Sequence, residues 1–288
     1  MKTKVFLLSI SLLVAAGAYA SDNTIKGNKK VTTRAISIND YDEISIAGSM
    51  TFEYEQSDAA PFLNITTDEN LFEYIRAEVK DRKLIIGPKA REFSGSSYNL
   101  QPSVFKIKSN SRGLEKLNSA GSGSFIVLSP LRVGKLDINL AGSGSVELKK
   151  ELTGEEVKIN TAGSGSVEAS GVITVKAISL HVAGSGEVNV DNINVETLQC
   201  NTAGSGSVRI EGRAREASYN VAGSGSIRAF GCKAGRVNVS QIGSGRIEVF
   251  AEDELTASKM GSGSISYKGN PSAVKKTPDR SRSIRQVQ

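Results

Sequence analysis

The stretch NTAGSGSVEA, from Asn160 to Ala169, contains the feature that decides the fold. Close variants of its Ala-Gly-Ser-Gly-Ser centre recur along the second half of the chain. The first glycines of eight copies lie 18 to 21 residues apart and are Gly121, Gly142, Gly163, Gly184, Gly204, Gly223, Gly243 and Gly261. A period of this length is typical of a solenoid, in which each repeat stacks on the next.

Apolar residues alternate with polar residues on both sides of each Gly-Ser-Gly turn. One column before the turn contains Leu117, Ile138, Ile159, Leu180, Cys200, Tyr219, Val239 and Ala257. One column after it contains Phe125, Val146, Val167, Val188, Val208, Ile227, Ile247 and Ile265. A period of two with many β-branched residues indicates strands. The sequence therefore predicts an all-β fold, a right-handed parallel β-helix (β-solenoid) with coils of about 20 residues and Gly-Ser-Gly corners.

The segments before the repeats differ in composition. Lys2 and Lys4 precede an apolar run and an Ala-x-Ala sequence ending at Ala20, which predicts a secretory signal peptide over residues 1–20. Residues 21–34 are polar and are expected to form a flexible leader. The rest is predicted to be a single β-helix domain, 35–288, with less regular opening coils at 35–115, regular coils at 116–270 and a degenerate basic end coil or tail at 271–288.

The opening region carries local signals of its own. A short helical turn is predicted near residues 68–75, capped by Thr67 or Asp68. Two strands should follow it, joined by a turn at Asp81 and Arg82. A separate small β domain is the alternative to opening coils of the same solenoid.

The final segment repeats the apolar spacing of the coil before it. Val274 and Ile284 lie 10 residues apart, as do Leu255 and Ile265. Arginines replace the corner glycines at Arg280 and Arg282. Such charges discourage end-to-end strand pairing, the role of a capping repeat, although the segment could equally be a disordered tail.

The positive charge is concentrated at the two ends of the chain. Of the net charge of +6, the signal peptide carries +2 and residues 271–288 carry +4, so the body between them is neutral. A neutral body argues against electrostatic binding of nucleic acid. No later stretch has the roughly 20 apolar residues of a transmembrane helix.

Outward-facing side chains are the candidates for binding. The corner serines form two ladders along one edge, and the predicted binding residues among them are Ser143, Ser164, Ser166 and Ser205. A hydroxyl ladder could bind a regular polymer such as a glycan, or it could be small residues that fit a crowded corner. The outward position after the corner supplies the like-charged pairs Glu147 with Glu168 and Arg209 with Arg228. Paired acids can cleave a polysaccharide, but such pairs are more often a charge ladder on a solvated face.

Asparagine recurs two residues before the corner alanine, and His181 takes its place once. Stacked asparagines hydrogen-bond along the axis of a β-solenoid, so His181 is predicted to belong to the ladder and not to act as a base. It is the only histidine, and no cluster of Cys and His accompanies it. The sequence therefore predicts no catalytic residue, no metal site and no cofactor, with a metal bound by carboxylates alone as the alternative left open. Cys200 and Cys232 could form a disulfide in an exported protein or remain buried thiols.

Three stretches together resemble the exported bacterial family of auto-transporter adhesins with a head GIN domain. They are YDEISIAGSM (41–50), DENLFEYIRAEVKDRKLIIG (68–87) and the run of AGSGS corners. The resemblance extends from Ile36 to the C-terminus and implies a right-handed β-helix with the GSG motifs at its tight turn. It also implies a role in cell adhesion, no established catalytic residues, and an envelope or outer-surface setting in Bacteroidetes. The sequence departs from the family pattern at Arg280 and Arg282.

The predicted function is that of an exported, non-enzymatic surface or envelope protein. Its repetitive face would bind surface glycan or a protein of a host or neighbouring cell, and the chain could form a homo-oligomer. The location would be the periplasm, the outer surface or the medium. A pectin-lyase-like enzyme that processes polysaccharide and a structural envelope scaffold are the alternatives.

Overall fold

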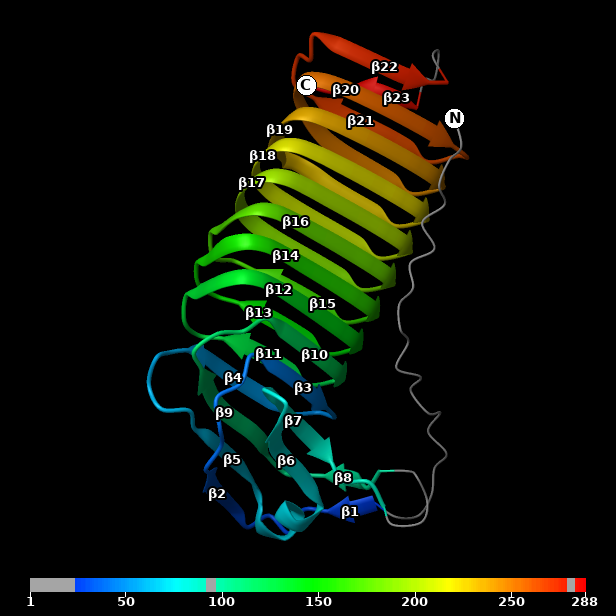
Figure 1. Cartoon of the computed structure of the whole chain (residues 1–288). Helices are drawn as coiled ribbons and strands as arrows, with labels where there is room; N and C mark the ends of the chain where they lie inside the picture. Colours follow the sequence, from blue (N-terminus) through cyan, green and yellow to red (C-terminus); the bar gives the residue numbers. More distant parts are fainter. Residues whose placement is uncertain (1–23, 92–96, 279–282) are drawn as a thin grey trace.

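The computed structural model describes residues 24–91, 97–278 and 283–288 and is a β-solenoid of about eight turns (Figure 1). Apart from one short 3-10 helix, the regular structure of these residues is strand. The predicted β-helix with coils of about 20 residues is confirmed. The predicted signal peptide, residues 1–20, lies outside the described residues.

The regular coils consist of parallel strands paired in register. The early coils have separate strands before and after each corner, namely β10 (Lys116–Gly121), β11 (Ser124–Val127), β12 (Leu131–Gly142), β13 (Ser145–Leu148), β14 (Leu152–Gly163), β15 (Ser166–Ala169) and β16 (Ile173–Gly184). The later coils run as continuous strands, namely β17 (Glu187–Gly204), β18 (Ser207–Gly223), β19 (Ser226–Gly243) and β20 (Arg246–Met260). The 21-residue repeats therefore have a short break opposite the corner, and the shorter repeats lack it.

The glycine corners follow from the backbone geometry. The first glycine of each of the eight corners has φ between +106° and +122°, where L-residues with a side chain are strained. Neighbouring corners are also in close contact, because a Cβ added to Gly163 would lie 2.6 Å from the Gly142 carbonyl oxygen. The Ser164 amide donates to that same oxygen at 2.9 Å. The repeated motif is thus required by stacking, whatever else it does.

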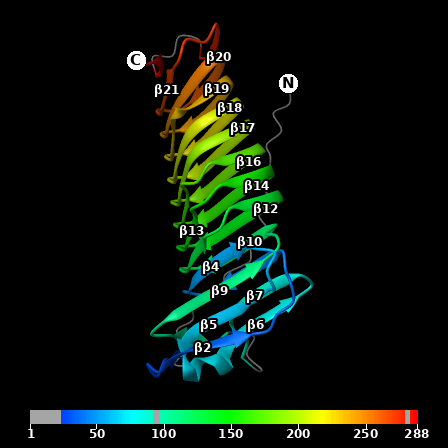
Figure 2. The same ribbon diagram turned by 90° about the vertical axis from the view of Figure 1, so that its left-hand side faces the viewer.

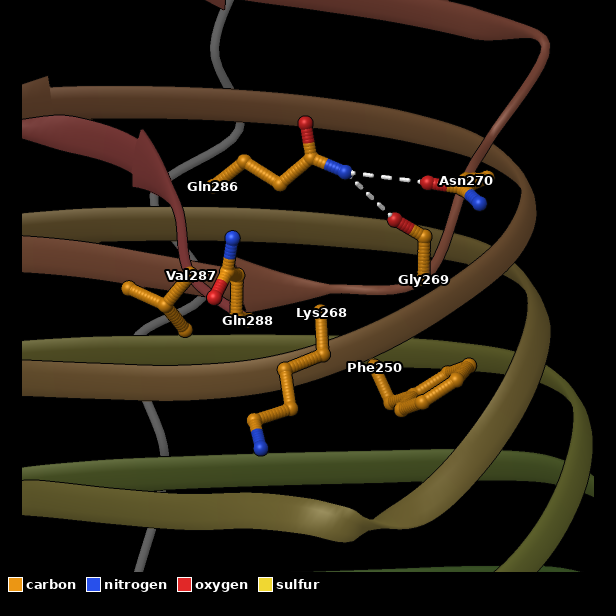
Figure 3. Close-up of a pocket in the computed structure, with 7 residues that line it drawn as sticks. All are labelled: Phe250, Lys268, Gly269, Asn270, Gln286, Val287 and Gln288. Carbon is orange, nitrogen blue, oxygen red and sulfur yellow. Dashed lines mark hydrogen bonds between the residues drawn. The ribbon is translucent and has the colours of Figure 1, made fainter.

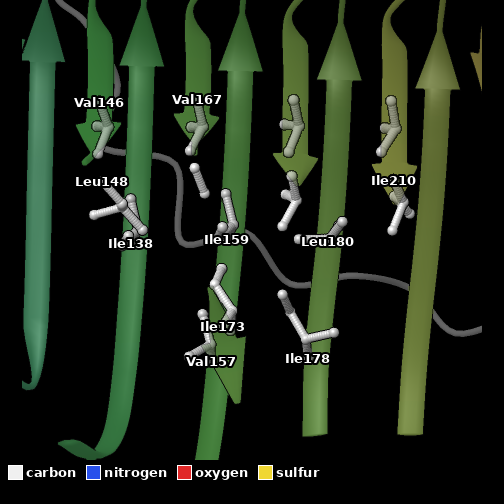
Figure 4. Close-up of a cluster of buried hydrophobic side chains, with 14 of the residues drawn as sticks. Ile138, Val146, Leu148, Val157, Ile159, Val167, Ile173, Ile178, Leu180 and Ile210 are labelled. Atoms are coloured by element: carbon white, nitrogen blue, oxygen red, sulfur yellow. The ribbon is translucent and has the colours of Figure 1, made fainter. Parts of the chain in front are cut away.

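The predicted apolar columns form the interior of the solenoid (Figure 4). Both columns are buried along their whole length, from Leu117 to Ala257 before the corners and from Phe125 to Ile265 after them. Side chains at equivalent positions lie directly above one another, as the pairing of Ile138 with Ile159 shows. Burial of these columns is the main stabilising contribution of the coils.

The N-terminal region closes one end of the solenoid (Figures 1 and 2). Strands β3 (Glu43–Ala47) and β4 (Thr51–Gln56) form a first coil, with a corner at Gly48 (φ +117°), and pair in parallel with β10 and β11. Their other edges pair with β7 (Lys83–Pro88) and β9 (Phe105–Ser111). The hydrogen-bonding edge of the first coil is therefore covered.

Antiparallel strands complete this end, which the coil pattern did not predict. They are β2 (Val31–Ile36), β5 (Leu63–Asp68) and β6 (Ile75–Lys80), while β1 (Thr24–Lys26) pairs separately with β8 (Asn99–Gln101). The expectation of a flexible leader over residues 21–34 is wrong where the chain is described. Residues 24–26 and 31–34 lie in β1 and β2, because β8 and β5 supply partners that are distant in sequence.

The helical turn and the hairpin predicted around residue 70 are confirmed. A 3-10 helix, η1 (Glu69–Tyr74), follows Asp68, and β6 and β7 form a hairpin. Asp81 and Arg82 have φ of +50° and +59°, as a type I′ turn requires. The predicted side-chain cap is absent, because the Asp68 carboxylate bonds to Lys29 and Ser103 instead.

The C-terminal end of the solenoid consists of β21 (Ser264–Lys268), β22 (Ala273–Thr277) and β23 (Ile284–Gln286), and β23 stacks on β21. Val274 pairs with Leu255, and Ile284 pairs with Ile265, as their spacing predicts. The described part of the basic end segment is thus a further coil. Arg280 and Arg282 lie outside the described residues.

A half-buried polar ladder runs along the outer face of the strands that lead into the corners. Asn139 Nδ2 donates to Asn118 Oδ1 at 3.1 Å, and Asn160 continues the series to Asn139 at 2.8 Å. Asn201 Nδ2 bonds His181 Nδ1 at 3.1 Å, so this nitrogen accepts when the ring proton is on Nε2. His181 is therefore a ladder residue, as predicted.

Replacing His181 by asparagine is expected to reduce the acid sensitivity of the fold. Burial, with a smaller effect of Lys158, lowers the pKa of His181 below its usual value of 6.5. As pH falls below about 6.5 the unfolded state binds a proton that the folded state resists, so stability is lost. The melting temperature should fall less between pH 7.5 and pH 5 for His181→Asn than for the wild type. An unchanged difference would contradict this role.

The two cysteines are free and buried. Cys200 lies in the apolar column one coil before Tyr219, and burial raises the pKa of both the Cys200 thiol and the Tyr219 hydroxyl. The Cys232 thiol, next to Tyr219, has its pKa raised to about 11, also mainly by burial. The disulfide left open by the sequence is not formed.

Candidate functional site

The corner serines form an exposed edge along the solenoid. The first serine of each corner is exposed in all eight copies, including Ser143, Ser164 and Ser205. The second serine is exposed at Ser166 and partly covered elsewhere. Hydroxyls of neighbouring coils bond where they meet, as Ser145 to Ser124 at 2.9 Å and Ser244 with Ser262 at 3.1 Å show. The edge is a regular series of hydroxyls about 4.8 Å apart, the spacing of paired strands.

The acidic pair is brought together but is not enclosed. Glu147 and Glu168 are direct partners in neighbouring strands. The Glu147 carboxylate lies 3.0 Å from Lys149 Nζ, and Glu168 is exposed. Asn189 separates Glu168 from Arg209 in the same outward row. The acids and the arginines are therefore on different coils and do not form one site.

The two predicted arginines have different surroundings although they are partners in neighbouring strands. Arg209 is neutralised by Asp191 at 3.0 Å and Glu211 at 2.6 Å. Arg228 forms no ion pair within the described part of the chain, although Glu248 is its partner on the next coil. Of the two predicted arginines, Arg228 alone is without an ion pair in the described part of the chain.

A hollow of about 390 Å³ opens beside Arg228 on the corner edge. We call it the arginine–serine hollow, and its lining residues are Ser224, Ser226, Arg228, Ser244, Gly245, Arg246, Ser262, Gly263 and Ser264. Arg246 lies in the position that serine occupies in six of the eight corners. It too has no ion pair among the described residues. The replacement of the corner serine by Arg246 could have indicated this site from the sequence, but Arg246 was not among the predicted binding residues.

Comparison with known proteins identifies the chain's relatives. The family model described as "Putative auto-transporter adhesin, head GIN domain" matches residues 40–175 and 157–271. The chain belongs to this family. A search of curated proteins gives no match.

Solved structures agree with the head GIN domain assignment. A crystal structure from Parabacteroides distasonis ATCC 8503, described as a "Putative lipid binding protein", is 42% identical, with a TM-score of 0.71. One from Parabacteroides merdae ATCC 43184, described as a "putative adhesin", is 30% identical, with a TM-score of 0.69. A second P. distasonis structure with that description is 31% identical, with a TM-score of 0.69. Each alignment covers 92% of this chain and 100% of the relative.

A second hollow, of about 510 Å³, lies at the end coil of this head GIN domain (Figure 3). Its polar groups largely bind one another, since Gln286 Nε2 donates to the Gly269 carbonyl at 2.8 Å and to Asn270 Oδ1 at 3.2 Å. The Phe250 ring lies 5.6 Å from Lys233 Nζ, a cation–π contact. This hollow therefore belongs to the closing edge of the solenoid, and few of its polar groups are available to bind a ligand.

The described residues also bear on metal binding, on membrane crossing and on the acidic pair. Within residues 24–91, 97–278 and 283–288, no three Cys, His, Asp or Glu side chains are grouped as a metal site. In the same residues no helix is long and apolar enough to cross a membrane. Neither hollow is lined by Glu147 or Glu168.

Proposed function

We propose that this chain is an exported, non-enzymatic adhesion module that binds surface glycan along its corner edge. The observation that carries the proposal is the unbroken series of exposed serines, one per coil, from Ser122 to Ser262. A straight series of hydroxyls at regular spacing is suited to a linear polymer with a repeating set of hydroxyls. Membership of an adhesin family supports a surface location and a binding role.

Glycan-array binding followed by turnover assays tests this function. The purified protein should bind immobilised polysaccharide and release no product from it. Replacing Ser143, Ser164 and Ser205 by alanine should weaken binding at least about tenfold, because each hydrogen bond lost contributes about 0.5–1.5 kcal/mol. The matched control is Thr174→Ala with Thr197→Ala, which removes exposed hydroxyls away from the corners. Product release would favour the polysaccharide-processing alternative.

Surface protease accessibility in intact cells tests the location. The signal peptide proposed for residues 1–20 predicts an exported protein, and an adhesin must be reachable from outside. Digestion by an added protease in intact cells is the expected result. Protection until the envelope is opened would instead favour a periplasmic scaffold.

A lipid ligand is the second candidate. The relative with 42% identity is described as a lipid-binding protein. Ile242 and Met260, which replace the corner alanine in the last two repeats, are partners in neighbouring strands and are 55% and 70% exposed. Flotation with phosphatidylglycerol vesicles should be reduced by Ile242→Ala with Met260→Ala if this candidate is correct.

A further inference from the structure

Comparison of the eight corners shows which of their residues the fold does not require. Six corners have serine at the position after the second glycine, so serine is sufficient for a stable corner. Arg246 departs from this pattern, and Arg228 lies two residues after Ser226, the partner of Arg246 in the neighbouring strand. Because alternate residues of a strand point to the same face, the two arginines are diagonal neighbours on the outer surface.

The two guanidinium groups form no ion pair among the described residues, although Glu248 is the strand partner of Arg228 and lies two residues after Arg246. Among the described residues, three arginines of nearby coils are paired, namely Arg209 with Asp191 and Glu211, and Arg215 and Arg236 with Glu216. Arg213 also has no ion pair there, but it does not line the hollow. Arg228 and Arg246 are both exposed and have no such pairing. Arginine binds carboxylate, sulfate and phosphate through two parallel N–H donors.

The rest of the hollow supplies neutral polar groups. Five serines line it, and the corner glycines Gly245 and Gly263 complete the lining. Buried beneath them is Gln241, whose Nε2 donates to the Gly245 carbonyl. Earlier coils have Thr202 and Val221 at this interior position. This bond joins the Gln241 side chain to the corner from inside the solenoid.

We propose that the arginine–serine hollow binds the acidic group of a glycan, with Arg228 and Arg246 on its carboxylate or sulfate and the serines on the sugar hydroxyls. This inference rests on the proposed function, since it assumes that the corner edge binds glycan. A lipid surface fits the hollow less well, because no apolar side chain lines it and Ile242 and Met260 are not part of the lining.

The test compares polygalacturonate with its fully methyl-esterified form, using the purified full chain in a binding assay at fixed salt. The two polymers share a backbone and differ in the carboxylate charge. The wild type should bind polygalacturonate at least about tenfold more tightly, since a charged hydrogen bond contributes about 1.5–3 kcal/mol. Arg228→Gln with Arg246→Ser should remove most of that preference.

The matched control is Arg209→Gln. Arg209 occupies the same outward row one coil earlier but is already neutralised by two acids, so its loss should change affinity less than about twofold. The Arg246→Ser change restores the serine of other corners, so the variant should melt at the wild-type temperature. An equal loss of binding in the Arg209 variant would overturn the assignment in favour of non-specific charge.

The outcomes separate this inference from the proposed function. Equal binding of both polymers would overturn the acidic-group assignment and leave glycan adhesion standing. Binding of neither polymer, nor of any glycan on an array, would overturn both. Binding to phosphatidylglycerol vesicles without binding to polygalacturonate would overturn the glycan assignment in favour of a lipid headgroup.

Discussion

Replacing Gly163 by alanine is expected to lower the free energy of unfolding by about 3 kcal/mol. Gly163 has φ of +115°, where a side chain is strained, and its added Cβ would lie 2.6 Å from the Gly142 carbonyl oxygen. That oxygen accepts the Ser164 amide, so the corner cannot move aside without breaking a bond between coils. Urea denaturation of the purified protein measures the change.

Gly134→Ala is the control for this prediction. Gly134 lies at an exposed position of β12, it is not among the glycines with positive φ, and a Cβ there would meet no atom within 4 Å. Alanine at that site should be neutral or slightly stabilising, because the unfolded chain loses freedom. Equal stability of the two variants would show that the corner glycines are not required by stacking.

Replacing Asp68 by alanine is expected to lower the free energy of unfolding, measured by urea denaturation, by about 3 kcal/mol. The reason is that several hydrogen bonds to a buried charged group are lost together. Asp68 Oδ1 accepts the Lys29 amide at 2.6 Å and the Ser103 hydroxyl at 2.7 Å, and Oδ2 accepts the Ser103 amide at 2.7 Å. The carboxylate is buried and joins segments 39 and 35 residues away. Its loss should loosen the closed end of the solenoid.

The acid dependence of the same site gives a second measurement. Burial opposes the charge of Asp68, but the bonds from Ser103 and Lys29 outweigh it, so its pKa lies below the usual 3.8. The unfolded state therefore takes up a proton first as pH falls, and the contribution present above about pH 4 is lost on acidification. Asp68→Ala should flatten this loss, whereas Asp58→Ala, at an exposed position, should leave both stability and its pH dependence unchanged.

The stacking pattern could be predicted from the sequence because it depends on local features repeated in every coil. Leu117 and its seven equivalents are buried, and His181 takes its expected place in the asparagine ladder. The antiparallel pairing of β2 with β5 at the closed end could not be predicted in this way. Val31 and Asp68 are partners although they lie far apart in the chain, and no period relates them.

The candidate site was predicted only in part for a similar reason. The sequence pattern placed Arg209 and Arg228 in one outward row and predicted the same binding role for both. The structure distinguishes them, because Asp191 and Glu211 neutralise Arg209. It also adds Arg246, which lies in a different column of the repeat and reaches the same hollow from the next coil.

The sequence by itself determined the coil, its register, its corners and its family. The period of the repeat and the alternation of apolar and polar residues are local features, and stacking repeats them in every coil. Only the tertiary structure decided which charges are already paired, how the first coil is covered and where the surface is hollow. Those properties depend on side chains from different coils meeting in space. The glycines of NTAGSGSVEA therefore account for the fold, and the exposed groups around the later corners are where we expect binding.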